Sequence, residues 1–362
     1  MEDAAPKTTA ATLAETVLPT TDLSGDLAFF GRELGFRLET IMPADDPRTA
    51  VMTGQGTRIR LEVCDDAPAT LILRSDTPTP ARTSPGGTRL RVEPLTPQLI
   101  QPETAHAFAV RRLADEAPWV IGRAGMQYRD LIPGRLGGSI IASHIRIPDG
   151  GPVPDMVHYH TVGFQLIFCY RGWVDLVYED QGPPFRLEAG NCVIQPPEIR
   201  HRVLYASDNI EVIEIGVPSE HVTTIDHEME LPNDTVNPDR LFQGQRFVHH
   251  EARNAEWRPA RQPGFIARDT TIAANTGDVA GVQVLHRGDG DPTWTTHNAD
   301  IHFTFVMEGR MTLEAEGHPT HQVVAGDAFT LPPGLATRYA APSADIELLE
   351  VTLPGSPHIE RP

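Results

Sequence analysis

Three histidines and one glutamine fall at intervals that favour a metal centre. They are His158, His160, Gln165 and His201. Imidazole nitrogens and an amide oxygen make a borderline donor set that suits Fe, Mn, Ni, Cu or Zn. Any one of these residues alone would be taken as a polar surface position. Together they predict one bound divalent transition metal per chain.

Neighbouring β-strands must bring these side chains to one centre. In a strand, side chains repeat on one face at every second residue, so His158 and His160 point inward together and Tyr159 points away. The next strand returns Gln165 to the same centre, and a later strand begins at His201. Glycines and prolines between these segments mark the turns of two β-hairpins.

The same residues resemble the motifs of the cupin superfamily. The segment HYHTVGFQLIFCYRG (158–172) is similar to the first motif, and GNCVIQPPEIRH (190–201) to the second. Gln165 stands where the family usually has Glu, and Glu198 where it has Gly. The resemblance implies a small antiparallel β-barrel, a double-stranded β-helix, with the metal held inside by the four residues named above.

The glutamine changes the charge of the predicted site. A neutral amide leaves a divalent ion one unit more positive than a carboxylate would. We therefore expect a weaker hold on the metal and a more acidic bound water or enolate. A ligand set that leaves coordination positions open is typical of a catalytic rather than a structural site.

The composition argues against several classes of function. The 362 residues include 49 acidic and 30 basic ones, a net charge of −19, which disfavours a nucleic acid partner. Cys64, Cys169 and Cys192 form no CxxC pair, so neither a disulfide framework nor a thiolate zinc site is expected. No run approaches the roughly 20 apolar residues of a membrane span, and the first residues lack a signal sequence. We expect a cytoplasmic protein with no membrane partner.

Residues 14–75 predict a small α+β module of order βαβββ. Asp22 is placed to cap its helix and Gly35 to end it. The segment LAFFGRELGF resembles a single module of the vicinal oxygen chelate (glyoxalase/extradiol dioxygenase) superfamily. The metal positions of that family correspond to Glu15 and Glu62 here, but we favour a structural role because such modules normally pair with a second copy, and none follows.

The rest of the chain predicts two cupin barrels in tandem, so the fold class is mainly β. A Pro- and Thr-rich stretch is taken as a linker between the α+β module and the first barrel. The expected segments are a disordered N-terminus (1–13), the α+β module (14–75), the linker (76–118), cupin domain 1 with the metal site (119–218), a connecting segment (219–262), cupin domain 2 with a degenerate site (263–355) and a tail (356–362).

The second barrel repeats the metal motif in weakened form. His297 and His302 take the second His position and the Glu position, while Thr295 and Thr337 stand where the other two histidines belong. We therefore favour a metal-free pocket. His297 and His302 form a second, weak candidate site that His286 could complete.

Three functions fit the predicted site. With Fe(II), which we favour, the neutral ligand set resembles the cupin dioxygenases that cleave diketones, flavonols such as quercetin, and related enolisable or phenolic substrates. With Zn, Mn or Ni, the same site would support isomerisation, cyclisation or lyase chemistry. The third reading is a non-catalytic bicupin that binds a small molecule.

No catalytic acid or base is evident from the sequence. Strand parity places four candidates in the pocket, Ile167, Cys169, Val203 and Tyr205. Only Tyr205 offers a hydroxyl, and Cys169 is expected to pack as a core residue. An apolar lining favours an aromatic or polyketide-like substrate. A homodimer is expected because a single N-terminal module leaves half of a cup unpaired.

Overall fold

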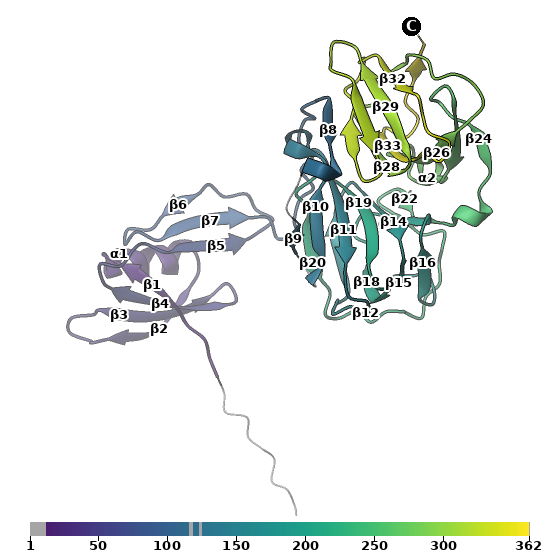
Figure 1. The fold of residues 1–362 in the computed structure, drawn as a ribbon. Coiled ribbons are helices and arrows are strands. Elements are labelled where there is room, and N and C mark those ends of the chain that lie inside the picture. Colours follow the sequence, from purple (N-terminus) through teal and green to yellow (C-terminus); the bar gives the residue numbers. More distant parts are fainter. Residues whose placement is uncertain (1–11, 116–118, 123–124, 362) are drawn as a thin grey trace, which may run out of the picture. The chain divides into compact units, whose positions relative to one another are not determined.

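The computed structural model of the chain describes residues 12–115, 119–122 and 125–361 (Figure 1). They form two compact units that divide after Gln98. The predicted disordered N-terminus (1–13) lies outside the described residues up to residue 11. Within the described part, none of the helices has the length and apolar character that crossing a bilayer requires.

The N-terminal unit contains a four-stranded sheet and one helix. Its strands are β1 (Thr16–Thr20), β4 (Thr57–Val63), β3 (Thr49–Gly54) and β2 (Arg37–Met42), in spatial order. Helix α1 (Leu23–Ala28) begins at Asp22, whose side chain accepts a hydrogen bond from the Gly25 N–H at 2.9 Å, which confirms the predicted cap. A π-helical turn (Phe29–Glu33) follows, and Gly35, with φ +72°, ends the helical segment.

The stretch predicted as a linker (76–118) is largely built into both units. Three short strands form a second sheet in the N-terminal unit, namely β5 (Thr70–Arg74), β7 (Arg89–Glu93) and β6 (Arg82–Thr83). The turn between β6 and β7 is anchored where the Gly86 N–H donates to buried Asp26 at 2.7 Å. Further on, β8 (Ala109–Arg111) pairs with a strand of the second barrel. The prolines and glycines therefore mark the ends of short strands here. Their high content made the stretch look like a linker in the sequence.

The first barrel is built from two sheets that face each other. The larger sheet has the order β23-β17-β14-β19-β11-β10-β9 and the smaller one β16-β15-β18-β13-β20. The bounds are β9 (Val120–Ile121), β10 (Gln127–Asp130), β11 (Ile141–Ile147), β13 (His158–Thr161), β14 (Phe164–Arg171), β15 (Trp173–Tyr178), β16 (Phe185–Glu188), β17 (Cys192–Ile194), β18 (His201–Ala206), β19 (Ile210–Val217), β20 (Val222–Ile225) and β23 (His249–His250), with β12 (Gly151–Pro152) on β18.

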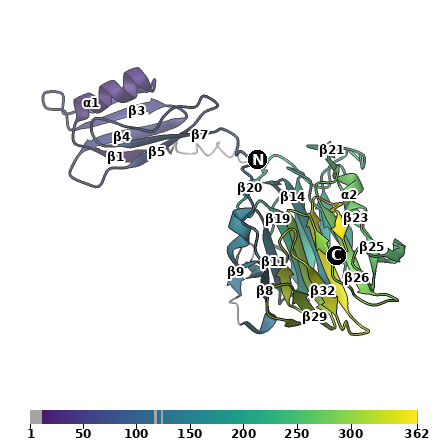
Figure 2. The same ribbon diagram turned by 90° about the horizontal axis from the view of Figure 1, so that it is seen from above.

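The second barrel repeats this plan. Its large sheet has the order β24-β25-β26-β33-β28-β31-β8, and smaller sheets β30-β29-β32 and β27-β34 complete it. The bounds are β24 (Trp257–Pro259), β25 (Phe265–Asp269), β26 (Gly281–Arg287), β27 (Thr296–His297), β28 (Ile301–Glu308), β29 (Arg310–Ala315), β30 (His321–Val324), β31 (Ala328–Thr330), β32 (Thr337–Ala340), β33 (Glu347–Leu353) and β34 (Ile359–Glu360), with helix α2 (Ile272–Asn275) before β26. Figure 2 shows both barrels within this unit.

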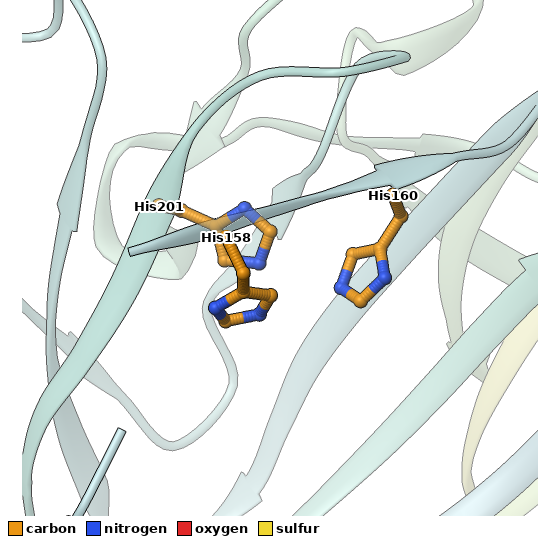
Figure 3. Close-up of side chains that lie close together, drawn as sticks. All are labelled: His158, His160 and His201. Atoms are coloured by element: carbon orange, nitrogen blue, oxygen red, sulfur yellow. The ribbon is translucent and has the colours of Figure 1, made fainter. Parts of the chain in front are cut away.

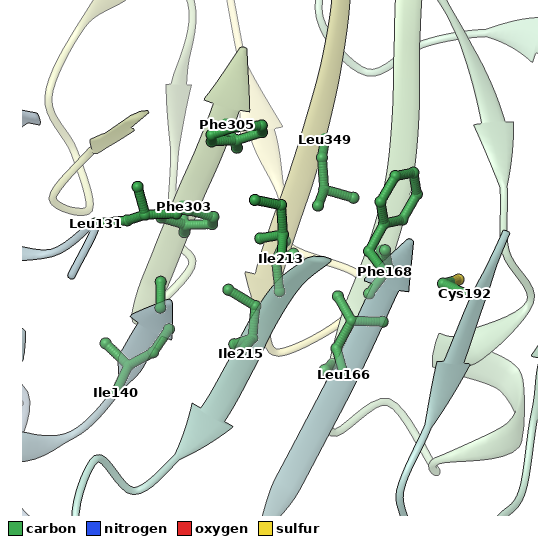
Figure 4. Packing of buried hydrophobic residues seen from close by; sticks show 14 of the residues in the cluster. Leu131, Ile140, Leu166, Phe168, Cys192, Ile213, Ile215, Phe303, Phe305 and Leu349 are labelled. Carbon is green, nitrogen blue, oxygen red and sulfur yellow. The ribbon is translucent and has the colours of Figure 1, made fainter. Parts of the chain in front are cut away.

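The large sheets of the two barrels share one hydrophobic core. On β14, Leu166 and Phe168 point into this core, and the alternate residue Ile167 points into the first barrel. Phe303 and Phe305 of β28 enter the core from the second barrel (Figure 4). Because both faces of these central strands are buried, they read as nearly continuous apolar runs.

The predicted connecting segment (219–262) and tail (356–362) also contribute strands to the barrels. β20 pairs with β13, β23 with β17, and β24 with β25. The tail strand β34 pairs with β27. These strands are two to four residues long, too short for a two-residue alternation to be recognised in the sequence.

Candidate metal centre

Three of the predicted ligands lie together inside the first barrel. His158 and His160 come from β13 and His201 from the start of β18, where His158 and His201 are register partners. One ring nitrogen from each lies within 4.8 Å of the other two. All three side chains are buried, with at most 8% of the residue exposed (Figure 3). The structure therefore brings these three histidines together, as their spacing predicts.

Each of the three rings has a hydrogen-bond partner at Nδ1, which leaves Nε2 as the nitrogen that can face a metal. The Nδ1 atom of His158 lies 2.7 Å from the carbonyl oxygen of Met156, and that of His201 lies 3.0 Å from the carbonyl oxygen of Ile199. Because a carbonyl only accepts, each Nδ1 carries the hydrogen and the lone pair lies on Nε2. This is the tautomer that metal-binding histidines adopt when a partner holds the far nitrogen.

His160 is held by a hydroxyl, which can donate or accept, on a strand that the sequence did not reveal. Its Nδ1 lies 2.9 Å from the hydroxyl of Thr223 on β20. A buried carboxylate also stands behind the cluster, since Asp155 Oδ1 is 3.6 Å from His158 Nδ1. The other oxygen of Asp155 accepts from the Val203 N–H at 3.0 Å. The three-histidine set therefore fits a divalent transition metal.

Gln165 presents its amide in an orientation that suits a fourth ligand. Its Nε2 donates to Glu214 Oε1 at 2.8 Å, and the residue is 1% exposed. Because an ionised carboxylate only accepts, the nitrogen must face Glu214. The amide oxygen is buried and has no hydrogen-bond partner among the described residues. Ligation by Gln165 stays a prediction, and this oxygen is the atom that would bind.

The second departure from the cupin motif lies in the turn before His201. Glu198 occupies the position where the family has Gly, and its φ is +64°. This left-handed conformation is the one that glycine adopts without strain. The Glu198 N–H donates to the carbonyl oxygen of His160 at 3.0 Å, which ties the turn to the ligand strand.

A cavity of about 320 Å³ opens over the histidines. Nine aliphatic side chains dominate its wall, including Ile141, Ile145 and Val212. Polar groups enter at a few points, and the sequence did not single them out. They are Tyr128, Ser143, Gln195, Glu214, His221 and Thr223. His221 also packs edge-on against His160, with ring centroids 5.3 Å apart.

Two of the four predicted pocket residues line this cavity. Ile167 and Val203 do so, as parity predicted. Tyr205 does not: it is 43% exposed and stacks on Trp173. A β-bulge is the reason, because the register of β15 and β18 shifts between Val203 and Tyr205, which turns Tyr205 to the outer face.

Cys169 packs as a core residue beyond the cavity wall. It is fully buried in the first barrel's hydrophobic cluster, and burial raises the pKa of its thiol to about 12. The supporting residues Asp155, Glu214 and Thr223 were missed in the sequence because each lies outside the HXH segment. Only the register of the folded strands identifies them.

The second barrel arranges its two histidines differently. The Ala299 N–H donates to Nδ1 of His297 at 3.1 Å, so the hydrogen of the neutral ring is on Nε2. This is the reverse of the tautomer inferred for His158 and His201. His302 Nε2 lies 3.2 Å from buried Glu350. This arrangement favours the metal-free reading.

His286 and the N-terminal glutamates are engaged elsewhere. His286 stacks on Trp257 with centroids 4.2 Å apart and lies 3.2 Å from Glu347, and it follows Leu285, which faces the barrel interior. In the N-terminal unit, Glu15 forms ion pairs with two arginines of β4 at 3.0 and 2.7 Å. Glu62 is exposed on the same strand. These contacts agree with a structural role for Glu15.

Comparison with known proteins identifies the barrels. Residues 281–352, in the second barrel, match the cupin domain family. A search of curated proteins gave no match. Among solved structures, oxalate decarboxylase from Bacillus subtilis at pH 4.6 is 14% identical, with a TM-score of 0.52 over 72% of this chain and 80% of that one. A deletion variant of the same enzyme gives 14% identity and a TM-score of 0.52 over 72% and 81%.

At this identity, the likeness to oxalate decarboxylase shows the fold alone. The likeness agrees with the predicted fold class, two cupin barrels in tandem. The domain match describes a cupin domain at residues 281–352, and the solved structures have the same arrangement of two such barrels.

Proposed function

We propose that this protein is a metal-dependent cupin enzyme, a dioxygenase acting on an enolisable or phenolic small molecule. The observation that carries the proposal is the cluster of His158, His160 and His201, whose Nδ1 atoms all face hydrogen-bond partners at the base of an apolar cavity. Gln165 would be the fourth ligand. Fe(II) is the metal we favour, and when bound it would supply the chemistry of dioxygen activation.

The cavity supports an apolar substrate. Its aliphatic wall would bury a ring or chain and exclude water, and its size suits one small organic molecule. Polar lining groups such as Tyr128, Ser143 and His221 are placed to orient oxygen atoms of that molecule. The protein would thus contribute binding, orientation and a dry site.

Metal identity is the first test. Protein purified without added metal should contain close to one iron per chain by elemental analysis. Iron-loaded protein should then consume oxygen with a member of a panel of catechols, flavonols and β-diketones. Absence of turnover with iron, together with tight retention of Zn, Mn or Ni, would replace the dioxygenase by an isomerase, cyclase or lyase.

The non-catalytic alternative has its own signature. A small-molecule-binding bicupin would bind a member of the same panel without consuming it, whatever the metal. We also propose a homodimer in the cytoplasm. Light scattering that shows a monomer at all concentrations would overturn the dimer.

A further inference from the structure

One acidic side chain stands in the wall of the mainly apolar cavity. Among the described residues that line it, Glu214 of β19 is the only acid, and there is no Lys or Arg. No salt bridge joins Glu214 to a Lys or Arg in the described parts of the chain. A carboxylate without a cationic partner in an apolar wall is costly, so its presence calls for an explanation.

Glu214 controls the amide of the predicted ligand Gln165. The hydrogen bond of 2.8 Å from Gln165 Nε2 to Glu214 Oε1 occupies one carboxylate oxygen and turns the amide oxygen away from Glu214. Without that acceptor the amide could rotate by half a turn and present its nitrogen instead. Glu214 therefore sets which atom of Gln165 is available to a metal.

The second barrel has an equivalent pair, His302 and Glu350, in the same strand register. Gln165 faces Gly216 on β19, two residues beyond Glu214, and His302 faces Thr352 on β33, two residues beyond Glu350. His302 Nε2 lies 3.2 Å from Glu350 Oε2. The acid behind this position is thus a feature of both barrels.

The two pairs differ in how the acid is neutralised. In the second barrel, Arg261 lies 3.6 Å from Glu350 Oε1, and Glu350 is only 3% exposed. In the first barrel no arginine outside the undescribed residues 116–118 and 123–124 accompanies Glu214, which is half-buried and lines the cavity. The negative charge of Glu214 therefore acts on whatever enters the cavity.

We infer that Glu214 is a positioning and specificity-determining residue: it orients the Gln165 amide, and it makes the cavity select a neutral, apolar ligand with a hydroxyl group over an anion. The inference rests on the proposed function. A hydroxyl can donate to the carboxylate, whereas an anion meets like charge in an apolar wall. In metal-free protein, where no divalent ion offsets the charge of Glu214, a dianion such as oxalate, named in the structural neighbours, is the ligand class that this wall disfavours most.

Two variants separate the charge from the hydrogen bond. Glu214→Gln retains an oxygen that can accept from Gln165 but removes the charge, and Glu214→Leu removes both. Glu188→Gln, on the exposed face of β16, is the matched control for a change of net charge. Circular dichroism and the melting temperature establish that each variant is folded.

The readouts are affinities, not turnover. Binding of 3-hydroxyflavone and of oxalate to metal-free protein is measured by fluorescence and calorimetry, and metal affinity by competition with a chelating dye. We expect wild-type protein to prefer the flavonol, and Glu214→Gln to weaken flavonol binding and strengthen oxalate binding, each about tenfold. Glu214→Leu, which removes the charge and the acceptor, should bind metal at least about tenfold more weakly than Glu214→Gln, which removes the charge alone.

Two results would overturn the inference. One is wild-type protein that binds oxalate as tightly as the flavonol, a measurement that needs no variant. The other is Glu214→Gln with unchanged ligand preference. A flavonol that binds in a Glu214-dependent manner but is never oxidised would leave this inference standing and overturn only the proposed dioxygenase.

Discussion

Asp155 and His158 form a buried pair in which a carboxylate oxygen lies 3.6 Å from the ring Nδ1. The side chains are 2% and 0% exposed. Asp155 is also held by the Val203 N–H, on the strand that begins with His201. The carboxylate therefore links both ligand strands and raises the electron density of the ring that faces the metal position.

Asp155→Asn should weaken metal binding without removing a ligand. Asn keeps an oxygen to accept from Val203 but loses the charge beside His158. We expect a loss of metal affinity of about tenfold to a hundredfold. A chelator competition titration measures it, with Asp175→Asn, whose partner is Arg186 at the surface, as the control. Equal affinities for the two variants would remove Asp155 from the site.

His160→Ala should abolish stoichiometric metal. The change removes one of three clustered nitrogens and leaves two histidines, too few to hold a divalent ion against chelation. Elemental analysis of the purified variant checks this, and His227→Ala, at an exposed position, is the control. Undiminished metal in His160→Ala would refute the assignment of the centre.

His297 should make the protein sensitive to acid. Burial, with a smaller effect of His302, lowers the pKa of His297 from 6.5 to about 3. Between these values the unfolded chain is protonated and the folded ring is neutral, so the stabilisation is complete above pH 6.5 and is lost as the pH falls toward 3. The free energy of unfolding should fall by about 2 kcal/mol between pH 7 and 4.5 from this group.

The matching variant for that measurement is His297→Asn. Asn retains an acceptor for the Ala299 N–H but cannot titrate. Urea unfolding at the two pH values should show a smaller pH dependence in the variant than in wild-type protein. Equal slopes would show that His297 titrates normally in the folded state.

One of the three thiols should react in the native protein. Burial raises the pKa of both Cys169 and Cys192 to about 12, while Cys64 is partly exposed in the N-terminal unit. A disulfide reagent should therefore modify one thiol per chain at neutral pH and three after unfolding. Rapid reaction of Cys169 in the native state would contradict its place in the barrel core.

The sequence predicts the histidine cluster well because its geometry is local. His158 and His160 are two residues apart on one strand, and strand parity alone places them on one face. Tyr205 shows where parity fails, since a single bulge between it and Val203 reverses the face and leaves no clear mark in the residue types. Glu214 and Thr223 depend on which strands pair, and pairing across 49 or 63 residues is not encoded in any short motif.

The hydrophobic core shared by the two large sheets gives the second barrel a structural role that requires no metal ligands. A chain cut after residue 262 would keep every predicted ligand of the first barrel but would expose Leu166, Phe168 and Ile215 of its large sheet to water. Such a fragment should aggregate rather than fold alone. The second barrel can cover this sheet with Thr295 and Thr337 in place of metal ligands, because the shared core needs only apolar side chains.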